Sequence, residues 1–249
     1  MKLVILGSGT CVPSLKRNAP GYLIEVEGLN LLVDCGSGTL LQLEKAGRSY
    51  RDIETVFITH CHPDHISDLM PLIHALIATP EYTRKKPLRI VGSSLVGEYL
   101  DGCIWGLLKR PDSFSVDFYR VEGKMEFHHL TLYSAKTLHS EDSFAFRFEH
   151  KGHSLVFTGD ADYSESLVEL CTGADLLVAD CSYPHELKRK GHLTPRECGI
   201  VASQAGVKHL ILSHLYPTKY SDKEILEECK REFNGRISIA EDLMEIDLI

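Results

Sequence analysis

Hydrophobic residues recur along the chain with two periods that alternate from one end to the other. Short apolar or alternating runs, which are typical of strands, are separated by stretches with apolar residues three and four positions apart, which are typical of helices. The runs predict strands over residues 2–6, 22–26, 30–34, 55–58, 88–91, 115–121, 126–133, 143–148, 154–158, 176–180 and 209–213. No linker rich in proline, glycine or serine divides them, so we expect a single domain over residues 1–249.

Helix signals lie between these strands. Apolar residues at helical spacing predict one helix that ends at Gly47, a residue suited to a helix C-terminus, and another that stops near Pro80. Capping boxes that begin at Thr194 and Ser221 predict two more. Two mixed halves, each pairing a sheet with helices, predict an α/β protein built as a four-layer αββα sandwich.

The segment HCHPDH, which directly follows the strand predicted over 55–58, gathers polar side chains that bind metals. Residues two apart in an extended segment point the same way, so His60 and His62 can hold one ion. Pro63 then turns the chain, and Asp64 and His65 can address a second ion nearby. Two metal ions about 3.5–4 Å apart form a clamp that is used for hydrolysis.

More ligands are expected where other apolar strands end. His139 in AKTLHS, Asp160 in VFTGDAD and His214 in LILSHLYP each occupy such a position and should emerge on one rim of the sheets. Asp160 is suited to bridging both ions because one carboxylate offers two oxygens. A lone histidine at a strand end is more often a structural hydrogen-bonding residue, but the cluster at 60–65 favours metal binding.

In chain order, Asp34 in LLVDCGSG, the THCHPDH segment, His139, Asp160 and His214 resemble the motifs of the metallo-beta-lactamase superfamily of binuclear zinc hydrolases. The resemblance covers nearly the whole chain and implies the metallo-beta-lactamase fold. It also implies a metal-bridging hydroxide as the nucleophile, and a buried Asp34 that orients a ligand loop. The ligands that it implies are His60, His62 and His139 for one zinc, Asp64, His65 and His214 for the other, and Asp160 for both.

A narrower resemblance concerns ribonuclease Z and its phosphodiesterase relatives. Pro13, Arg17 and Asn18 match the PxxxRN pattern at the start of that group, and Asp180 and His192 look like its acidic residue and histidine beside the site. A histidine held by a carboxylate could stabilise the transferred phosphoryl group or protonate the leaving oxygen. The alternative is a surface histidine in a basic loop. The residues expected to take part in catalysis are Asp34, Asp64, Asp180 and His192.

The chain departs from ribonuclease Z in two places. The long arm that grips tRNA in those enzymes is absent, since only residues 140–159 separate the third and fourth motifs, and SDLMPL replaces the glycine-rich stretch expected after the histidine cluster. A net charge of -8 also argues against broad nucleic-acid binding. We therefore expect a zinc-dependent phosphodiesterase that acts on a small or short phosphodiester, such as a cyclic phosphate or nucleotide.

Four alternatives stay open. One is cleavage of precursor tRNA, with an arm supplied by a partner subunit in a homodimer. The others are hydrolysis of an ester, lactone or thioester, an iron-bound redox protein, and a noncatalytic binding protein, which the complete ligand set disfavours. Zinc is the expected metal, with manganese or iron as alternatives.

Composition indicates the class of protein and its cellular location. Values of 43% hydrophobic and 25% charged residues are ordinary for globular proteins. No apolar run approaches the ~20 residues that cross a bilayer, and MKLVILGSGT reads as a first strand rather than a signal peptide, so no membrane partner and a cytoplasmic location are expected. Eight cysteines without a CxxC pair indicate free thiols. The basic clusters at 84–89 and 188–190 are interpreted as solvated loops.

Overall fold

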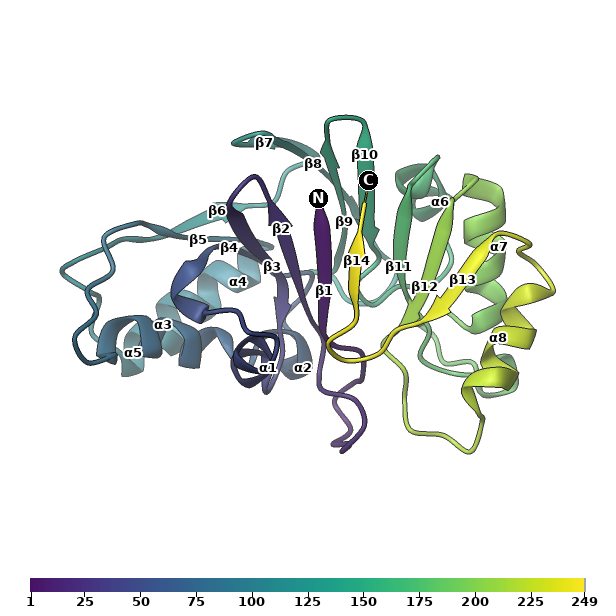
Figure 1. Ribbon diagram of the computed structural model, residues 1–249, viewed down its shortest axis with the longest axis horizontal. Helices are drawn as coiled ribbons and strands as arrows, with labels where there is room; N and C mark the ends of the chain where they lie inside the picture. The colour runs from purple at the N-terminus through teal and green to yellow at the C-terminus, as the bar shows by residue number, and fades with distance from the viewer. Residues whose placement is uncertain (249) are drawn as a thin grey trace.

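The computed structural model describes residues 1–248, whose strands form two seven-stranded sheets. The first sheet has the order β14-β1-β2-β3-β4-β5-β6 and the second the order β13-β12-β11-β10-β9-β8-β7 (Figure 1). The strands of the first sheet are β1 (Lys2–Gly7), β2 (Gly21–Val26), β3 (Leu29–Cys35), β4 (Ile53–Phe57), β5 (Leu88–Gly92), β6 (Val116–Arg120) and β14 (Glu245–Asp247). Those of the second are β7 (Lys124–Phe127), β8 (Leu130–Lys136), β9 (Phe144–His150), β10 (His153–Phe157), β11 (Leu176–Asp180), β12 (His209–Ser213) and β13 (Arg236–Ile239).

Helices cover the outer face of each sheet. The first sheet is covered by α1 (Thr39–Lys45), α2 (Pro63–Ile66), α3 (Leu69–Ala78), α4 (Ser94–Tyr99), a π-helical turn (Leu100–Ile104) and α5 (Trp105–Leu107). The second is covered by α6 (Glu165–Cys171), α7 (Pro195–Ala205) and α8 (Asp222–Lys230). Short 3-10 helices lie at Tyr50–Asp52 and His185–Leu187.

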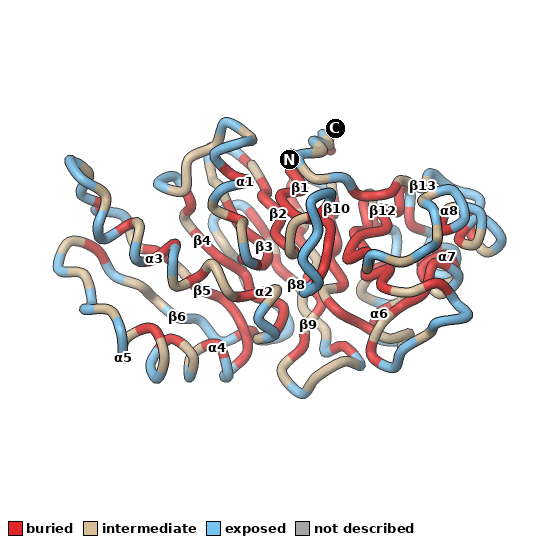
Figure 2. The backbone as a smooth tube through the Cα atoms, turned by 90° about the horizontal axis from the view of Figure 1, so that it is seen from below, coloured by how far each residue is buried: buried red, intermediate tan, exposed pale blue. Residues whose placement is uncertain are grey.

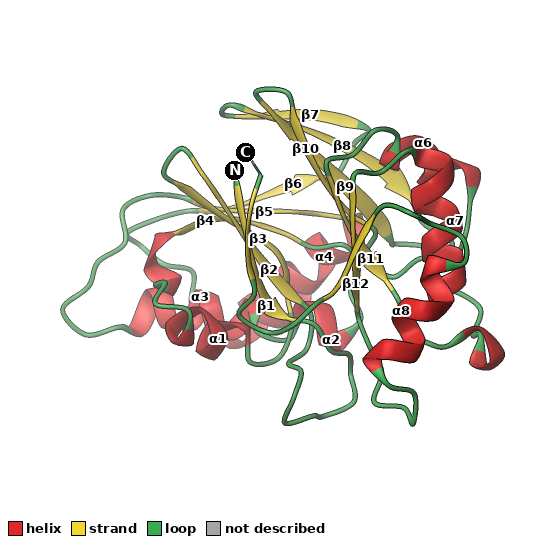
Figure 3. Ribbon diagram, turned by 45° about the vertical axis from the view of Figure 1, so that its right-hand side comes forward, coloured by secondary structure: helices red, strands yellow, loops and turns green. Residues whose placement is uncertain are grey.

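Three separate hydrophobic clusters make the layers. One lies between the two sheets, where Phe57, Phe148 and Phe157 are buried and the rings of Phe57 and Phe148 meet edge to face with centroids 5.0 Å apart. The second joins the first sheet to α1–α4, and the third joins the second sheet to α6–α8. Figure 2 shows the resulting concentration of buried residues along the strands, and Figure 3 shows the helices outside both sheets. The predicted αββα sandwich is confirmed.

Strand direction decides where the loops gather. In the second sheet β10, β11 and β12 are parallel neighbours, and in the first sheet β3, β4 and β5 are parallel neighbours. Parallel strands bring their carboxyl ends to one edge of a sheet, so the loops that follow them lie together.

Most predicted elements are confirmed, including antiparallel β9 with its alternating burial and both capping boxes. The single strand predicted over 126–133 is wrong. It is two strands, β7 and β8, joined by a tight turn at which His128 has a φ of 53°. Apolar residues continue on both arms, and neither glycine nor proline marks the turn. Helices α4, α5 and α6 and strands β13 and β14 were not predicted from the sequence.

Other expectations from composition have mixed outcomes. All eight cysteines are free. Within residues 1–248, no helix is long and apolar enough to cross a membrane. The interpretation of the basic clusters as solvated loops is wrong for three members, one of which, Arg89, is half-buried in β5. Arg84 is buried and donates to the backbone carbonyls of Arg51 and Ile53, and Lys188 is held between two carboxylates.

Candidate metal centre

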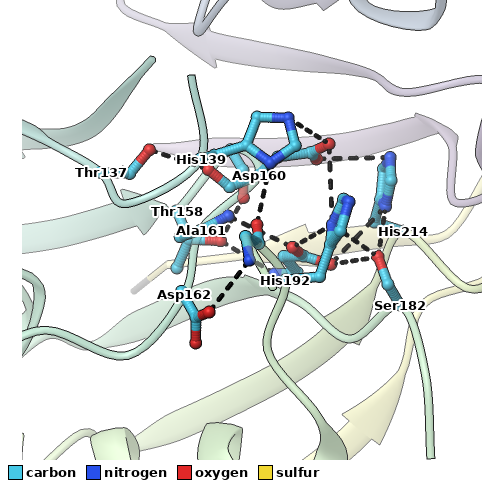
Figure 4. Close-up of polar contacts among 12 residues, drawn as sticks. Thr137, His139, Thr158, Asp160, Ala161, Asp162, Ser182, His192 and His214 are labelled. Carbon is cyan, nitrogen blue, oxygen red and sulfur yellow. Dashed lines mark hydrogen bonds and ion pairs between the residues drawn. The ribbon is translucent and has the colours of Figure 1, made fainter. Parts of the chain in front are cut away.

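The predicted ligands come together from loops of both sheets. The segment from His60 to His65 follows β4 and runs into α2, whose first residue Pro63 ends the extended stretch. His139 follows β8, Asp160 follows β10, and His214 follows β12. The ends of these strands therefore bring seven side chains from distant parts of the chain close together between the sheets. Figure 4 shows three of them, His139, Asp160 and His214.

The seven side chains divide into two groups on either side of Asp160. One group contains His60, His62 and His139; Nε2 of His139 lies 3.0 Å from Nδ1 of His62 and 3.5 Å from Oδ2 of Asp160. Nε2 of His60 lies 3.7 Å from the same oxygen. These atoms surround a space that an ion can occupy while it bonds to each of them.

The second group faces the other carboxylate oxygen. Oδ1 of Asp160 lies 3.3 Å from Nε2 of His65 and 3.3 Å from Nε2 of His214. Oδ2 of Asp64 completes this group, 3.4 Å from Nε2 of His214. Asp160 thus presents one oxygen to each group.

Unpaired buried atoms show that the centre fits metal ions. Nε2 of His60, His65 and His214 and Oδ1 of Asp160 are buried without a hydrogen-bond partner among residues 1–248. Buried polar atoms are almost always paired, because an unpaired one costs roughly 1–3 kcal/mol. The atoms of His65, His214 and Asp160 lie together in the second group, and Nε2 of His60 lies in the first. Together with the other side chains they form an imidazole and carboxylate donor set of the kind that holds divalent cations.

The electrostatics of the centre agree with that fit. Burial would lower the pKa of His65, but the carboxylates of Asp160 and Asp34 raise that pKa to about 10. Burial would raise the pKa of Asp160, yet the imidazoles of His214 and His65 hold it well below its usual range. Carboxylates that keep a proton on a buried imidazole attract a cation, and a bound metal would release that proton.

Further polar residues hold the imidazole rings of His65 and His214 through their Nδ1 atoms, on the side away from Asp160. Oδ2 of Asp34, which is buried in β3, lies 2.7 Å from Nδ1 of His65, while Oδ1 accepts from the backbone N–H of Thr59 at 2.8 Å. Ser182 Oγ lies 2.8 Å from Nδ1 of His214. Thr59 and Ser182 were not predicted from the sequence, because nothing local distinguishes a hydroxyl that contacts a distant histidine.

His192 and Asp180 form a pair beside the second group. Nδ1 of His192 lies 2.9 Å from Oδ2 of Asp180, and its ring stacks on that of His214 at a centroid separation of 5.7 Å. Burial would lower the pKa of His192, but the hydrogen bond and charge of Asp180 raise it above its usual value. Asp180 also accepts from Ser182 and from the backbone of Ala161, so its oxygens are satisfied without a metal.

Two tyrosines that the sequence did not single out border this pair. Tyr183 and Tyr216 stack with centroids 4.6 Å apart, and both meet the ring of His192 edge to face. Each lies three residues beyond the end of a strand, Tyr183 after β11 and Tyr216 after β12. That position is the only signal that could have found them.

The PxxxRN residues have a structural place. Arg17 is buried and donates to Ser8 Oγ and the carbonyl of Ala240, and the Asn18 side chain donates to the carbonyl of Ser37. Together they fix the loop before β2. This loop borders a groove of about 330 Å³ that also reaches Asp64.

Known proteins share this architecture. The family model described as Anti-Pycsar protein Apyc1 matches residues 1–228. Ribonuclease Z from Archaeoglobus fulgidus is 28% identical over 302 aligned residues, covering 99% of this chain and 97% of that protein. The probable metallo-hydrolase YhfI from Bacillus subtilis is 28% identical over 247 residues, covering 96% of this chain and 97% of that protein.

Solved structures agree. The metallo-beta-lactamase fold protein YhfI from Bacillus subtilis aligns with a TM-score of 0.87 and 26% identity over 98% of both chains. The human tRNase Z, short form, has the same fold, with a TM-score of 0.80 and 24% identity over 99% of both chains. The chain therefore belongs to the family of the anti-Pycsar protein Apyc1, within the ribonuclease Z and phosphodiesterase-like subgroup of the metallo-beta-lactamase superfamily of metal-dependent hydrolases.

Proposed function

We propose that this protein is a phosphodiesterase that uses two zinc ions to hydrolyse a small phosphodiester such as a cyclic nucleotide. The position of Asp160 carries the proposal, because its Oδ2 faces His60 and His139 while its Oδ1 lies 3.3 Å from both His65 and His214. A carboxylate in that position can bridge two ions at the spacing of about 3.5–4 Å used for in-line hydrolysis.

The ligand assignment follows from the two groups. Imidazole nitrogens and carboxylate oxygens suit zinc, with manganese or iron as alternatives for the same donors. When bound, the ions would acidify a water and neutralise negative charge that develops on the phosphoryl oxygens. We assign His60, His62 and His139 to one ion, Asp64, His65 and His214 to the other, and Asp160 to both.

His192 supplies the proton in this proposal. Asp180 binds its Nδ1, so the other ring nitrogen, Nε2, is left to face the substrate. The raised pKa of His192 favours the protonated ring, which can donate to a phosphoryl oxygen or to the leaving oxygen. Asp180 acts through His192, and Asp34 acts through His65.

The short connection between β9 and β10 supports a small substrate. The two strands are joined by Lys151 and Gly152 alone, both with positive φ as a tight hairpin turn requires. No arm therefore extends between His139 and Asp160. YhfI aligns with this chain over 247 residues, whereas the alignment with ribonuclease Z of Archaeoglobus fulgidus needs 302.

The direct test is a substrate screen on one sample whose metal content is measured. We expect two zinc ions per chain and hydrolysis of cyclic nucleotides or simple diesters. Asp160→Asn should lower kcat/KM by about 100-fold or more, because the amide weakens both metal sites. Asp112→Asn is the matched control, because Asp112 is exposed and distant in sequence from every proposed ligand. Full activity in Asp160→Asn, or no diester hydrolysis by zinc-loaded protein, would exclude the proposal.

The second candidate is cleavage of precursor tRNA. It is favoured by relatives named ribonuclease Z, including one from Ignicoccus hospitalis that covers 100% of this chain at 27% identity. Precursor tRNA therefore belongs in the screen, together with light scattering to find whether a homodimer forms. Activity on small diesters without cleavage of that RNA would remove this candidate.

His192→Ala separates phosphodiester hydrolysis from hydrolysis of esters, lactones or thioesters. A phosphodiesterase should lose roughly 100- to 10,000-fold in kcat, since general-acid catalysis contributes that much. Carboxylic ester turnover on the same metals does not need this donor. Unchanged diester turnover in His192→Ala would contradict the role that we assign to it.

A further inference from the structure

The loop over residues 188–192 is held in place by ion pairs between Lys188 and two carboxylates outside the loop. Nζ of Lys188 lies 2.6 Å from Oδ1 of Asp162 and 2.6 Å from Oε2 of Glu197, and it donates to the carbonyl of His192 at 2.7 Å. Only 27% of the Lys188 side chain is exposed. Asp162 follows β10, and Glu197 lies in the first turn of α7, so this ammonium group joins three segments.

The same loop contacts a proposed metal ligand. The carbonyl of Gly191 lies 2.9 Å from Nδ1 of His139, and the N–H of Gly191 donates to Oδ2 of Asp162 at 2.9 Å (Figure 4). Gly191 has a φ of +90°, and a Cβ there would lie 2.9 Å from Nδ1 of His139. Only glycine allows so close an approach.

Asp162 therefore accepts hydrogen bonds from both Lys188 and Gly191. One oxygen binds Lys188 and the other holds the backbone of Gly191, whose carbonyl accepts the N–H of His139. With Nδ1 engaged, Nε2 of His139 must face His62 and Asp160. The loop ends at His192, which is bound to Asp180.

We infer that Lys188 is a positioning residue, which holds the 188–192 loop so that Gly191 orients His139 toward the metal and His192 meets Asp180. This inference rests on the proposed function and adds a residue to it. Lys188 does not serve as a free positive charge for substrate, because two carboxylates already neutralise it. Its neighbours Arg189 and Lys190 are exposed.

Loss of the ammonium group should displace the loop. Asp162 and Glu197 would then face each other as like charges in a half-buried place, which is far more costly than losing an exposed ion pair. His139 would keep its chemistry but lose its fixed ring orientation. Supporting contacts of this kind typically change metal affinity or activity by about 10- to 100-fold.

Cobalt(II) gives a readout that needs no substrate. We expect Lys188→Met to weaken Co²⁺ binding by about 10-fold or more and to change the visible spectrum of the bound ion, while Lys188→Arg restores both. Lys190→Met is the matched control, and its spectrum and affinity should equal those of the original protein. With a phosphodiester substrate, Lys188→Met should lower kcat with little change in KM.

A double-mutant cycle separates positioning from a general loss of structure. In a His139→Ala background, Lys188→Met should cause no further loss of Co²⁺ affinity, since the ring that it orients is gone. A full additional loss there, or an unchanged spectrum and affinity in Lys188→Met alone, would overturn the inference. Thermal unfolding of every variant identifies misfolding, and Asp162→Asn then repeats the test from the other partner.

The two proposals fail in different ways. If the zinc-loaded protein hydrolyses no phosphodiester, the proposed function is wrong, and the cobalt spectra still decide whether Lys188 positions His139. If diesters are hydrolysed and Lys188→Met keeps both the cobalt spectrum and kcat, only the role of Lys188 is wrong.

Discussion

At the scale of single residues, two residues of the centre have backbone conformations that residues other than glycine rarely adopt. Asp34 has a φ of 59° and His214 a φ of 56°, both in the left-handed region. Non-glycine residues are uncommon there, and such strain is characteristic of functional sites. Both side chains serve the centre: Oδ2 of Asp34 contacts Nδ1 of His65, and Nε2 of His214 faces Oδ1 of Asp160.

Asp34→Asn tests how far the buried carboxylate supports His65. Asparagine tolerates a left-handed backbone and keeps the shape, but it accepts the proton of Nδ1 of His65 less strongly. We expect about a 10- to 100-fold loss in zinc affinity, measured by competition with a chelating dye, with the fold retained. Asp52→Asn, on the exposed surface, should bind zinc like the original protein. Equal affinities in the two variants would show that Asp34 has no such role.

At the scale of elements, β12 lies between β11 and β13, and its first residue shows what the packing imposes. His209 is buried, and its Nε2 contacts Ser238 of β13 at 3.0 Å. Burial, together with the charge of Arg236, lowers the pKa of His209 to about 4. The second sheet therefore contains a histidine that is neutral in the folded protein.

This histidine predicts an acid-sensitive contribution to stability. Because its pKa in the folded protein lies below the unfolded value of 6.5, its contribution is complete above that pH and is lost as the pH falls toward 4. From about pH 7 to pH 5, the free energy of unfolding should fall about 1–2 kcal/mol more in the original protein than in His209→Gln. Urea unfolding across that range measures the difference, and parallel pH curves for the two proteins would contradict it.

At the scale of the whole molecule, the centre joins the two halves of the sandwich. His60, His62 and His65 come from the loop after β4 of the first sheet, while His139 and Asp160 follow strands of the second. Ions bound between these loops would connect the sheets at the edge where the hydrophobic layer between them ends. We therefore expect metal binding to stabilise the sandwich as well as to serve catalysis.

Chelation tests this coupling. Removing the metal should lower Tm by about 5–10 °C, since a ligand at 100 times its Kd contributes about 2.7 kcal/mol. Asp160→Asn should have a lower Tm that responds little to chelator, because its sites hold metal weakly. Calorimetry with and without chelator gives both values. An Asp160→Asn protein that responds to chelator as the original does would show that the bridge adds no stability.

The sequence predicted the layers and all seven of the proposed ligands. Strand and helix periods follow from local burial, so they are visible in the sequence. The four ligands from His60 to His65 lie within six consecutive residues, so their pattern is also visible without a structure. His139, Asp160 and His214 could be found because each ends an apolar strand. The tight turn between β7 and β8 was missed, because its histidines carry no turn signal.

Only the tertiary structure decided how these residues are divided and supported. The two oxygens of Asp160 face different histidines because β10 and β12 end at the same edge, and Lys188 meets Asp162 and Glu197 because a loop folds back over α7. Such contacts join positions distant in sequence, and no local period encodes them. The sequence specifies which chemistry is available, and the packing of the two sheets decides which atoms meet.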